Sequence, residues 1–198
     1  MDNKILFLSI GTDAEEVLNF FYKKEKIDYL SIDNQSQTLN LSKRKTIWFN
    51  DNEYQKTQKD MEFHEKVLQT KFNILKDELK NYKHVIIVLY LGKEDVLNNL
   101  VEITKYLKSL KISHDIVGIT PLFFKGGKDM DNHYINTTIK YLKSMGYVPG
   151  DNLYIYNCLK VYKEKKKNVI IKYSLQKYLL KNITDVLSLI SDLRKQKE

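Results

Sequence analysis

Carboxylates follow two apolar runs of this sequence at the points where helices are expected to begin. The run Lys4 to Ile10 leads into Gly11-Thr12-Asp13-Ala14-Glu15-Glu16, and the run Val85 to Leu91 leads into Gly92-Lys93-Glu94-Asp95. A helix N-terminus binds phosphate through its free N–H groups and its positive dipole end. Acidic side chains repel phosphate, so both loops argue against a phosphate site.

Thr12 and Glu15 have the T-x-x-E spacing of a capping box. In that motif the two side chains bond the free N–H groups of the first helical turn themselves. We therefore expect the N-terminus of the first helix to be occupied by its own side chains, with Asp13 and Glu16 adding negative charge.

Other residue types that could do chemistry are scattered. Cys158 is the single cysteine, lies in an apolar stretch, and is expected to be a buried small residue rather than a nucleophile. His133 lies one helical turn from Asp129 and close to Asp131, but a solvated helix face is the favoured interpretation. The histidines are far apart in the sequence without metal-site spacing: His64, His84, His114 and His133. We predict no catalytic residue, no metal and no cofactor.

The composition is that of one globular domain over residues 1–198, with 42% hydrophobic residues and few glycines and prolines. No apolar run reaches the length of a membrane span, and the first residues do not resemble a signal peptide, so a cytoplasmic location is expected. The net charge is +8, which permits binding to nucleic acid or to another anionic surface. That function is an alternative rather than the favoured one, because the lysines are spread along the chain and Arg44 and Arg194 are the only arginines.

Apolar runs alternate with amphipathic segments along the whole chain. This alternation predicts a Rossmann-like three-layer α/β fold with a mostly parallel sheet, the first strand central and the last helix packed along it. The expected strands are Lys4 to Ile10, Ile27 to Ile32, Thr46 to Phe49, Val85 to Leu91, Asp115 to Thr120 and Leu153 to Leu159. The expected helices are Ala14 to Tyr22, Glu62 to Tyr82, Val96 to Leu110, Asp129 to Ser144 and Leu175 to Arg194.

Three segments resemble the cell-division protein FtsZ of the tubulin/FtsZ superfamily. The segment Ile27 to Ser42, IDYLSIDNQSQTLNLS, resembles the family's F-I-A-I-N-T-D-A-Q-A-L-N-L-S. Val117 to Met130, VGITPLFFKGGKDM, resembles V-G-V-V-T-R-P-F-x-F-E-G-x-x-R-x, and Leu153 to Asn157 resembles the strand that ends in I-P-N. The order of the segments matches the family's N-terminal GTP-binding domain over nearly the whole chain.

The sequence departs from the family where the nucleotide would bind. The signature G-G-G-T-G-T-G should follow Tyr90, but Leu91-Gly92-Lys93-Glu94-Asp95-Val96-Leu97 stands there, and Asn50 to Asp60 replaces a third glycine-rich loop. The resemblance therefore implies a degenerate nucleotide site. Its positions are Gly11, Thr12, Asp13, Gly92, Lys93, Glu94 and Asn157, of which only Asn157 matches the family cleanly.

The end of the chain resembles the long central helix of the family at Leu175 to Leu193. The chain stops at Glu198, before the family's catalytic N-x-D-x-x-D loop and its second domain. We predict a non-enzymatic interaction module, with a residual nucleotide binder or GTPase as a second alternative. The predicted partner is FtsZ itself or another copy of this chain. The surface predicted to bind it comprises Thr12, Asp13, Lys93, Glu94, Phe123, Phe124 and Lys125.

Overall fold

A computed structural model describes residues 4–33, 46–48, 61–92, 94–120, 128–158, 160 and 172–196. Within these ranges, side chains are described except at residues 33, 46–48, 61–68, 94–95, 128–132 and 172–177.

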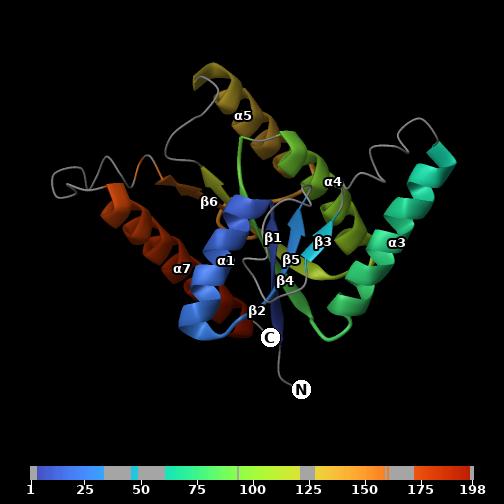
Figure 1. Cartoon of the computed structure of the whole chain (residues 1–198), viewed down its shortest axis with the longest axis horizontal. Helices are drawn as coiled ribbons and strands as arrows, with labels where there is room; N and C mark the ends of the chain where they lie inside the picture. The colour runs from blue at the N-terminus through green and yellow to red at the C-terminus, as the bar shows by residue number, and fades with distance from the viewer. Residues whose placement is uncertain are drawn as a thin grey trace.

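The centre of the molecule is a six-stranded sheet with the strand order β3-β2-β1-β4-β5-β6 (Figure 1). Every pair of neighbouring strands is parallel. The prediction of a parallel sheet with the first strand in its interior is therefore confirmed. The strands are β1 (Ile5–Ile10), β2 (Asp28–Asp33), β3 (Thr46–Trp48), β4 (His84–Tyr90), β5 (Ser113–Thr120) and β6 (Leu153–Asn157).

Helices cover both faces of this sheet, as a three-layer α/β fold requires. One face packs against α1 and α7, and the other packs against α3, α4 and α5 (Figure 1). Each helix lies within a few residues of its expected range. The bounds are α1 (Thr12–Glu25), α3 (Met61–Leu79), α4 (Glu94–Ser109), α5 (Lys128–Ser144) and α7 (Lys172–Gln196).

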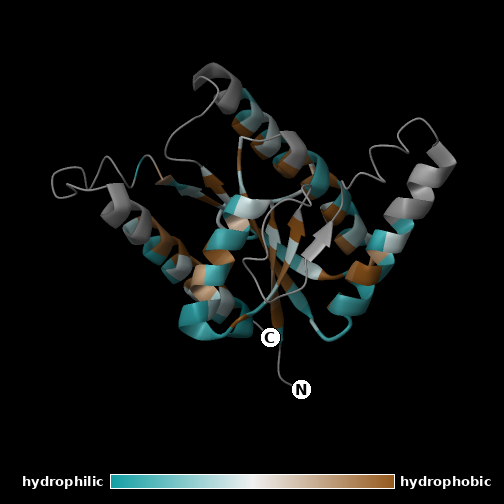
Figure 2. Ribbon diagram, viewed as in Figure 1, coloured by the Kyte–Doolittle hydropathy of each residue, from teal (hydrophilic) through white to brown (hydrophobic). Residues whose placement is uncertain are grey.

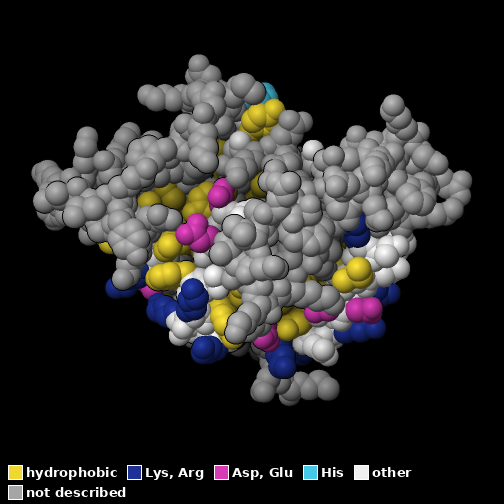
Figure 3. All heavy atoms as spheres, in the orientation of Figure 1, with side chains coloured by type: hydrophobic (Ala, Val, Ile, Leu, Met, Phe, Trp, Pro, Cys, Tyr) yellow, Lys and Arg dark blue, Asp and Glu magenta, His cyan; other side chains and the backbone are white. Residues whose placement is uncertain are grey.

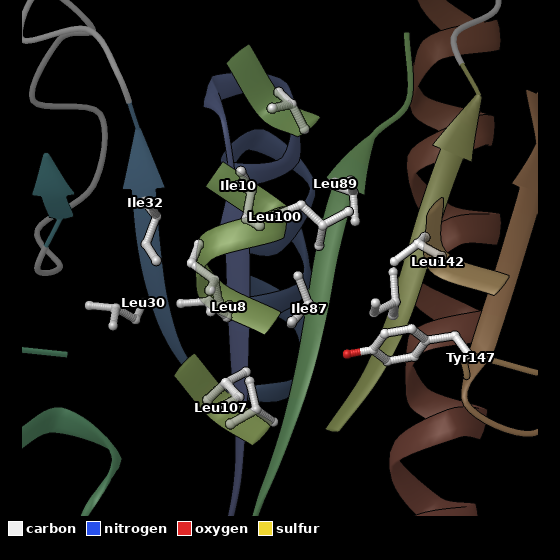
Figure 4. Close-up of a cluster of buried hydrophobic side chains, with 14 of the residues drawn as sticks. Leu8, Ile10, Leu30, Ile32, Ile87, Leu89, Leu100, Leu107, Leu142 and Tyr147 are labelled. Carbon is white, nitrogen blue, oxygen red and sulfur yellow. The ribbon is translucent and has the colours of Figure 1, made fainter. Parts of the chain in front are cut away.

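The core consists of two hydrophobic layers, one on each side of the sheet. Strand β4 is buried on both faces from its first residue almost to its last, which explains why its sequence is continuously apolar. Hydropathy follows the layers, with hydrophobic residues on the inner sides of the helices (Figure 2). Figure 4 shows the layer in which strand residues pack with α4 and α5, and it labels Leu8, Ile10, Ile87, Leu89, Leu100, Leu107, Leu142 and Tyr147.

The two ends of the parallel strands define two edges of the sheet. The carboxyl edge comprises the strand ends Ile10, Tyr90, Thr120 and Asn157 and the residues that follow them. The amino edge comprises the starts of the strands and the last turns of the helices that lead into them. None of the helices in the described ranges is long and apolar enough to cross a membrane.

A buried ion pair joins the last helix to the amino edge. The carboxylate of Asp115 accepts two hydrogen bonds from the Arg194 guanidinium, at 2.7 Å each, and one from His84 Nε2 at 3.0 Å. The Asp115 side chain is 1% exposed. Burial alone would raise the pKa of Asp115, but the hydrogen bonds from His84 and Arg194 outweigh burial and lower it.

Candidate functional site at the carboxyl edge

The fold brings together several of the residues that were predicted to form a site. Parallel strands end at the same edge of a sheet, and the register aligns Ile10 with both Ile32 and Leu89 and aligns Thr120 with Asn157. Gly11, Thr12, Asp13, Gly92 and Asn157 therefore lie at or directly after neighbouring strand ends. Lys93, Phe123, Phe124, Lys125 and the Glu94 side chain lie outside the described residues.

The first loop turns at Gly11, which has φ 83° and ψ 157° and is the N-cap of α1. Its N–H donates to the Ile32 carbonyl at 2.8 Å, and its own carbonyl accepts from the N–H groups of Ala14 and Glu15 at 3.2 Å each. The positive φ favours glycine, because side chains make this conformation strained.

The predicted capping box is wrong. Helix α1 starts at Thr12 itself, and its N-cap is Gly11, which has no side chain to make a cap hydrogen bond. Thr12 is thus the first helical residue, one position too late to act as the N-cap, because Gly11 already makes the turn out of β1.

The first turns of α1 and α4 meet over Gly11. A Cβ atom added to Gly11 would lie 3.3 Å from Val96 Cγ2, and the Val96 side chain is only 5% exposed. After β4 the backbone continues as Leu91, whose N–H donates to the Ile119 carbonyl at 2.8 Å, and α4 begins at Glu94. Hydrocarbon from Leu91 and Val96 therefore fills the root of this edge.

The described polar groups next to Tyr90 are acidic or neutral, while Lys160 lies further along the carboxyl edge, after Asn157. Burial raises the pKa of the Tyr90 phenol, and the nearby Cys158, Asp13, Glu16 and Tyr156 raise it further. Asp13 and Glu16 thus lie close enough for their charges to act on Tyr90. Figure 3 shows acidic side chains beside hydrophobic ones near the upper end of α1. An anion placed here would face a negative potential.

The single cysteine is unsuited to nucleophilic chemistry. Cys158 is 2% exposed, and burial raises the pKa of its thiol to about 11. The thiol is therefore protonated at neutral pH, while the thiolate is the nucleophilic form. The expectation that Cys158 is a buried small residue is confirmed.

Within the part of the chain that the structure describes, two buried hydroxyls at this edge have no hydrogen-bond partner, Thr120 Oγ1 and the Tyr156 hydroxyl. Thr120 is the last residue of β5, and Tyr156 is the last residue but one of β6. Sequence reasoning missed both, because each stands in a strand-like stretch and only the fold shows that neither hydroxyl has a partner. Asn157, by contrast, is used, because its Oδ1 accepts the N–H of Lys160 at 2.9 Å.

Two of the four histidines lie at the opposite edge of the sheet. His84 and His114 lie on the neighbouring strands β4 and β5 at the amino edge, although they are far apart in the sequence. His84 bonds Ser113 Oγ through Nδ1 and Asp115 through Nε2. This Ser–His–Asp order is not a catalytic triad, because Arg194 already neutralises the carboxylate that would stabilise a charged imidazole.

The described residues contain no cluster of His, Cys, Asp and Glu that could hold a metal ion. His133 is exposed on α5, with its ring against Tyr134. The side chains of Asp129 and Asp131 lie outside the described residues, so the acid–base constellation stays untested.

His114 makes the stability of the fold depend on pH. Its Nδ1–H donates to the Ile112 carbonyl at 2.8 Å, which leaves Nε2 to accept from the Tyr147 hydroxyl. Burial lowers the pKa of His114, although the bond to Ile112 partly opposes this shift, and Lys108 and His84 lower it further.

We expect the urea midpoint to be constant above about pH 6.5 and to fall as the pH drops below it, because the unfolded chain then binds a proton that the fold disfavours. His114→Gln, which keeps a donor and an acceptor, should flatten this slope. The lowered pKa of Asp115 acts only in a more acidic window, below about pH 4. An equal slope in the variant would contradict the assignment to His114.

Comparison with known proteins gives the fold a context. No protein-family model and no curated protein matches the sequence. Among solved structures, CetZ from Methanosaeta thermophila has a TM-score of 0.65 with 11% identity, over 96% of this chain and 54% of that chain. TubZ from bacteriophage PhiKZ has 0.63 with 15% identity, over 96% and 62%.

FtsZ from M. jannaschii has a TM-score of 0.63 with 16% identity, over 96% of this chain and 56% of that chain. The chain thus spans roughly half to two thirds of the length of these neighbours. At such low identity the likeness concerns the fold alone. The chain has the fold of the tubulin/FtsZ superfamily, and it corresponds to the part of that fold built on the parallel sheet.

Proposed function

We propose that this chain is a non-catalytic FtsZ-like module that acts on a protein filament or a second copy of itself through its carboxyl edge. The observation that carries the proposal is the packing of Val96 against Gly11, with Asp13 and Glu16 acting on Tyr90 beside it. In this fold class, ligands bind at the carboxyl edge. Here hydrocarbon and negative charge occupy the part of that edge where the first turns of α1 and α4 meet.

Hydrolysis of a nucleoside triphosphate requires donors aimed at the phosphates, a metal ion and a positioned water. The short path from Leu91 through Gly92 to the start of α4 at Glu94 leaves little backbone to surround an anion. The acidic first turn of α1, with Asp13 and Glu15, opposes phosphate at its N-terminus. Both features disfavour hydrolysis of a nucleoside triphosphate, and they therefore support a module that binds protein without catalysis. One neighbour, CetZ2 from Haloferax volcanii, is described as a protofilament bound to GTPγS, which makes nucleotide binding the property to test.

The nucleotide test titrates the full chain with Mg-GTP and with Mg-ATP in a calorimeter. An FtsZ measured under the same conditions is the positive control. We expect no heat of binding at micromolar nucleotide and no phosphate release. A dissociation constant below about 10 μM, which corresponds to roughly −7 kcal/mol, would overturn the proposal in favour of a residual nucleotide binder.

The partner test uses Phe124→Ala and Glu94→Lys, because both positions belong to the predicted partner surface. We expect each variant to weaken self-association in the ultracentrifuge or co-sedimentation with FtsZ polymers. Lys140→Glu, a change at an exposed position in the C-terminal half of α5, is the matched control and should bind like the wild type. If wild type and both edge variants bind equally well, the carboxyl edge is not the interface.

A further inference from the structure

We propose that the amino edge of the sheet binds an anionic membrane surface, with its lysines on the lipid headgroups and with Val148 and Leu193 entering the headgroup layer. This surface lies at the opposite edge from the proposed partner site, and it stands independently of that proposal.

Exposed lysines gather at the amino edge because the last turn of each described helix, or the connection from it to the next strand, carries them. Figure 3 shows basic side chains along the lower margin of the molecule, with acidic side chains between them. The lysines are Lys4 before β1, Lys23, Lys24 and Lys26 before β2, Lys76, Lys80 and Lys83 before β4, Lys108 and Lys111 before β5, Lys143 before β6, and Lys195 in the last turn of α7.

Much of this charge is uncompensated. Among the described residues, eleven lysines lie at the edge with eight carboxylates. Asp115 is held by Arg194 and Asp185 by Lys24, and the others are Glu25, Asp28, Asp77, Glu78, Asp151 and Asp192. Lys24, Lys80 and Lys195 pair with carboxylates. No ion pair to a described residue is found for Lys4, Lys23, Lys26, Lys83, Lys111 or Lys143.

Two of these lysines have a backbone conformation that glycine adopts with less strain. Lys26 ends α1 with φ 55° and Lys111 follows α4 with φ 56°, both in the left-handed region. At the end of α5 the corresponding turn uses Gly146, with φ 87°. Helix dipoles favour lysine in a last turn, but they do not explain left-handed lysines, nor Lys4 and Lys83, which precede strands.

Two exposed apolar side chains accompany the charge. Val148 is 53% exposed in the turn before β6, and Leu193 is 50% exposed in the last turn of α7. The two elements are joined at this point, because Arg194 donates to the Asp151 carbonyl and the Val148 carbonyl accepts from the N–H of Asp151. A basic patch combined with apolar side chains supplies the two signals that peripheral membrane attachment requires.

A bilayer fits this edge better than a nucleic acid does. The lysines stand on the ends of separate helices, and mobile headgroups adapt to any such spacing, whereas a duplex presents phosphates in fixed rows. Arg194, the one arginine in the described residues, is committed to Asp115, and the Tyr22 ring already packs with Lys26 and Tyr29. Nucleic-acid sites use aromatic rings that stack on bases and arginines that bind phosphate with two hydrogen bonds. These residues therefore offer neither.

The test measures co-sedimentation of the full chain with vesicles that contain about 30 mol % phosphatidylserine at about 0.1 M salt. We expect binding to these vesicles, which higher salt weakens, and none to vesicles of phosphatidylcholine alone. The double variant Lys26→Gly/Lys111→Gly should bind about tenfold more weakly. Its melting temperature should be unchanged or higher, because glycine adopts positive φ without strain, so misfolding cannot explain the loss.

The matched control is Lys140→Ala/Lys181→Ala, which removes the same charge from exposed positions within α5 and α7 and should bind like the wild type. Val148→Asp/Leu193→Asp should lose binding with every lysine intact. The proposal fails if the wild type ignores anionic vesicles, if both lysine pairs lose binding equally, or if duplex DNA is bound while vesicles are not.

Discussion

Replacing Asp115 by asparagine is expected to lower the free energy of unfolding by about 3 to 5 kcal/mol, which for a domain of this size is a large part of its stability. The change leaves the Arg194 guanidinium, whose side chain is 15% exposed, without its carboxylate. The amide keeps one acceptor oxygen, so the change removes an acceptor either from His84 Nε2 and Arg194 Nε, which share Oδ2, or from Arg194 Nη2. His84 is buried at the amino edge. Urea denaturation of wild type and variant at neutral pH measures the difference.

Asp192→Asn is the matched control, because it removes a carboxylate two residues from Arg194 in the same helix. Asp192 pairs with Lys195 at 3.5 Å and is 58% exposed, so water screens the pair. We expect a change of no more than about 1 kcal/mol there. Equal effects of the two variants would show that the Asp115 cluster, which is Asp115 with His84 and Arg194, does not stabilise the packing of α7 on the sheet.

The layers of this fold could be predicted because each strand carries its own signal. The run from Val85 to Leu91 is apolar at every position, which requires cover on both faces and hence a parallel sheet between helix layers. Once the strands are parallel, their carboxyl ends must meet, so Gly11, Gly92 and Asn157 could be placed at one edge from sequence alone.

The Asp115 cluster could not be predicted, because its members come from β4, β5 and α7 and only the register of the sheet brings them together. A weak signal exists, since His84 and Asp115 are polar residues at the amino ends of apolar runs. Such a position is compatible with a solvated strand end, so the sequence does not distinguish a buried ion pair from exposed charge.

The capping box failed for a related reason. T-x-x-E specifies a cap only if the helix begins after the threonine, and that depends on how the preceding strand ends. Here Gly11 turns the chain one residue earlier.

The clustering of the lysines could not be predicted for a similar reason. Lysines that are spread along the sequence occur in the last turn of each described helix or in the connection after it, and the fold collects them at the amino edge.

The packing at the root of the carboxyl edge gives the second large effect. A Cβ atom added to Gly118 would lie 3.0 and 3.1 Å from the two Cδ atoms of Leu91 and 3.1 Å from Ile155 Cδ1. We expect Gly118→Ala to lower the free energy of unfolding by about 1 to 3 kcal/mol through overpacking. Leu91→Ala, which leaves a cavity at a side chain that is 2% exposed, should lower it by about 2 to 5 kcal/mol.

The double variant decides whether these two residues share one space. Truncating Leu91 removes two of the three close contacts, so the new methyl group enters the cavity and the combined loss should fall short of the sum by about 1 to 2 kcal/mol. Leu75→Ala with Gly118→Ala is the control, because Leu75 is equally buried but lies in α3, and its loss should add to within about 0.5 kcal/mol. Strict additivity with Leu91 would mean that its side chain does not lie over β5.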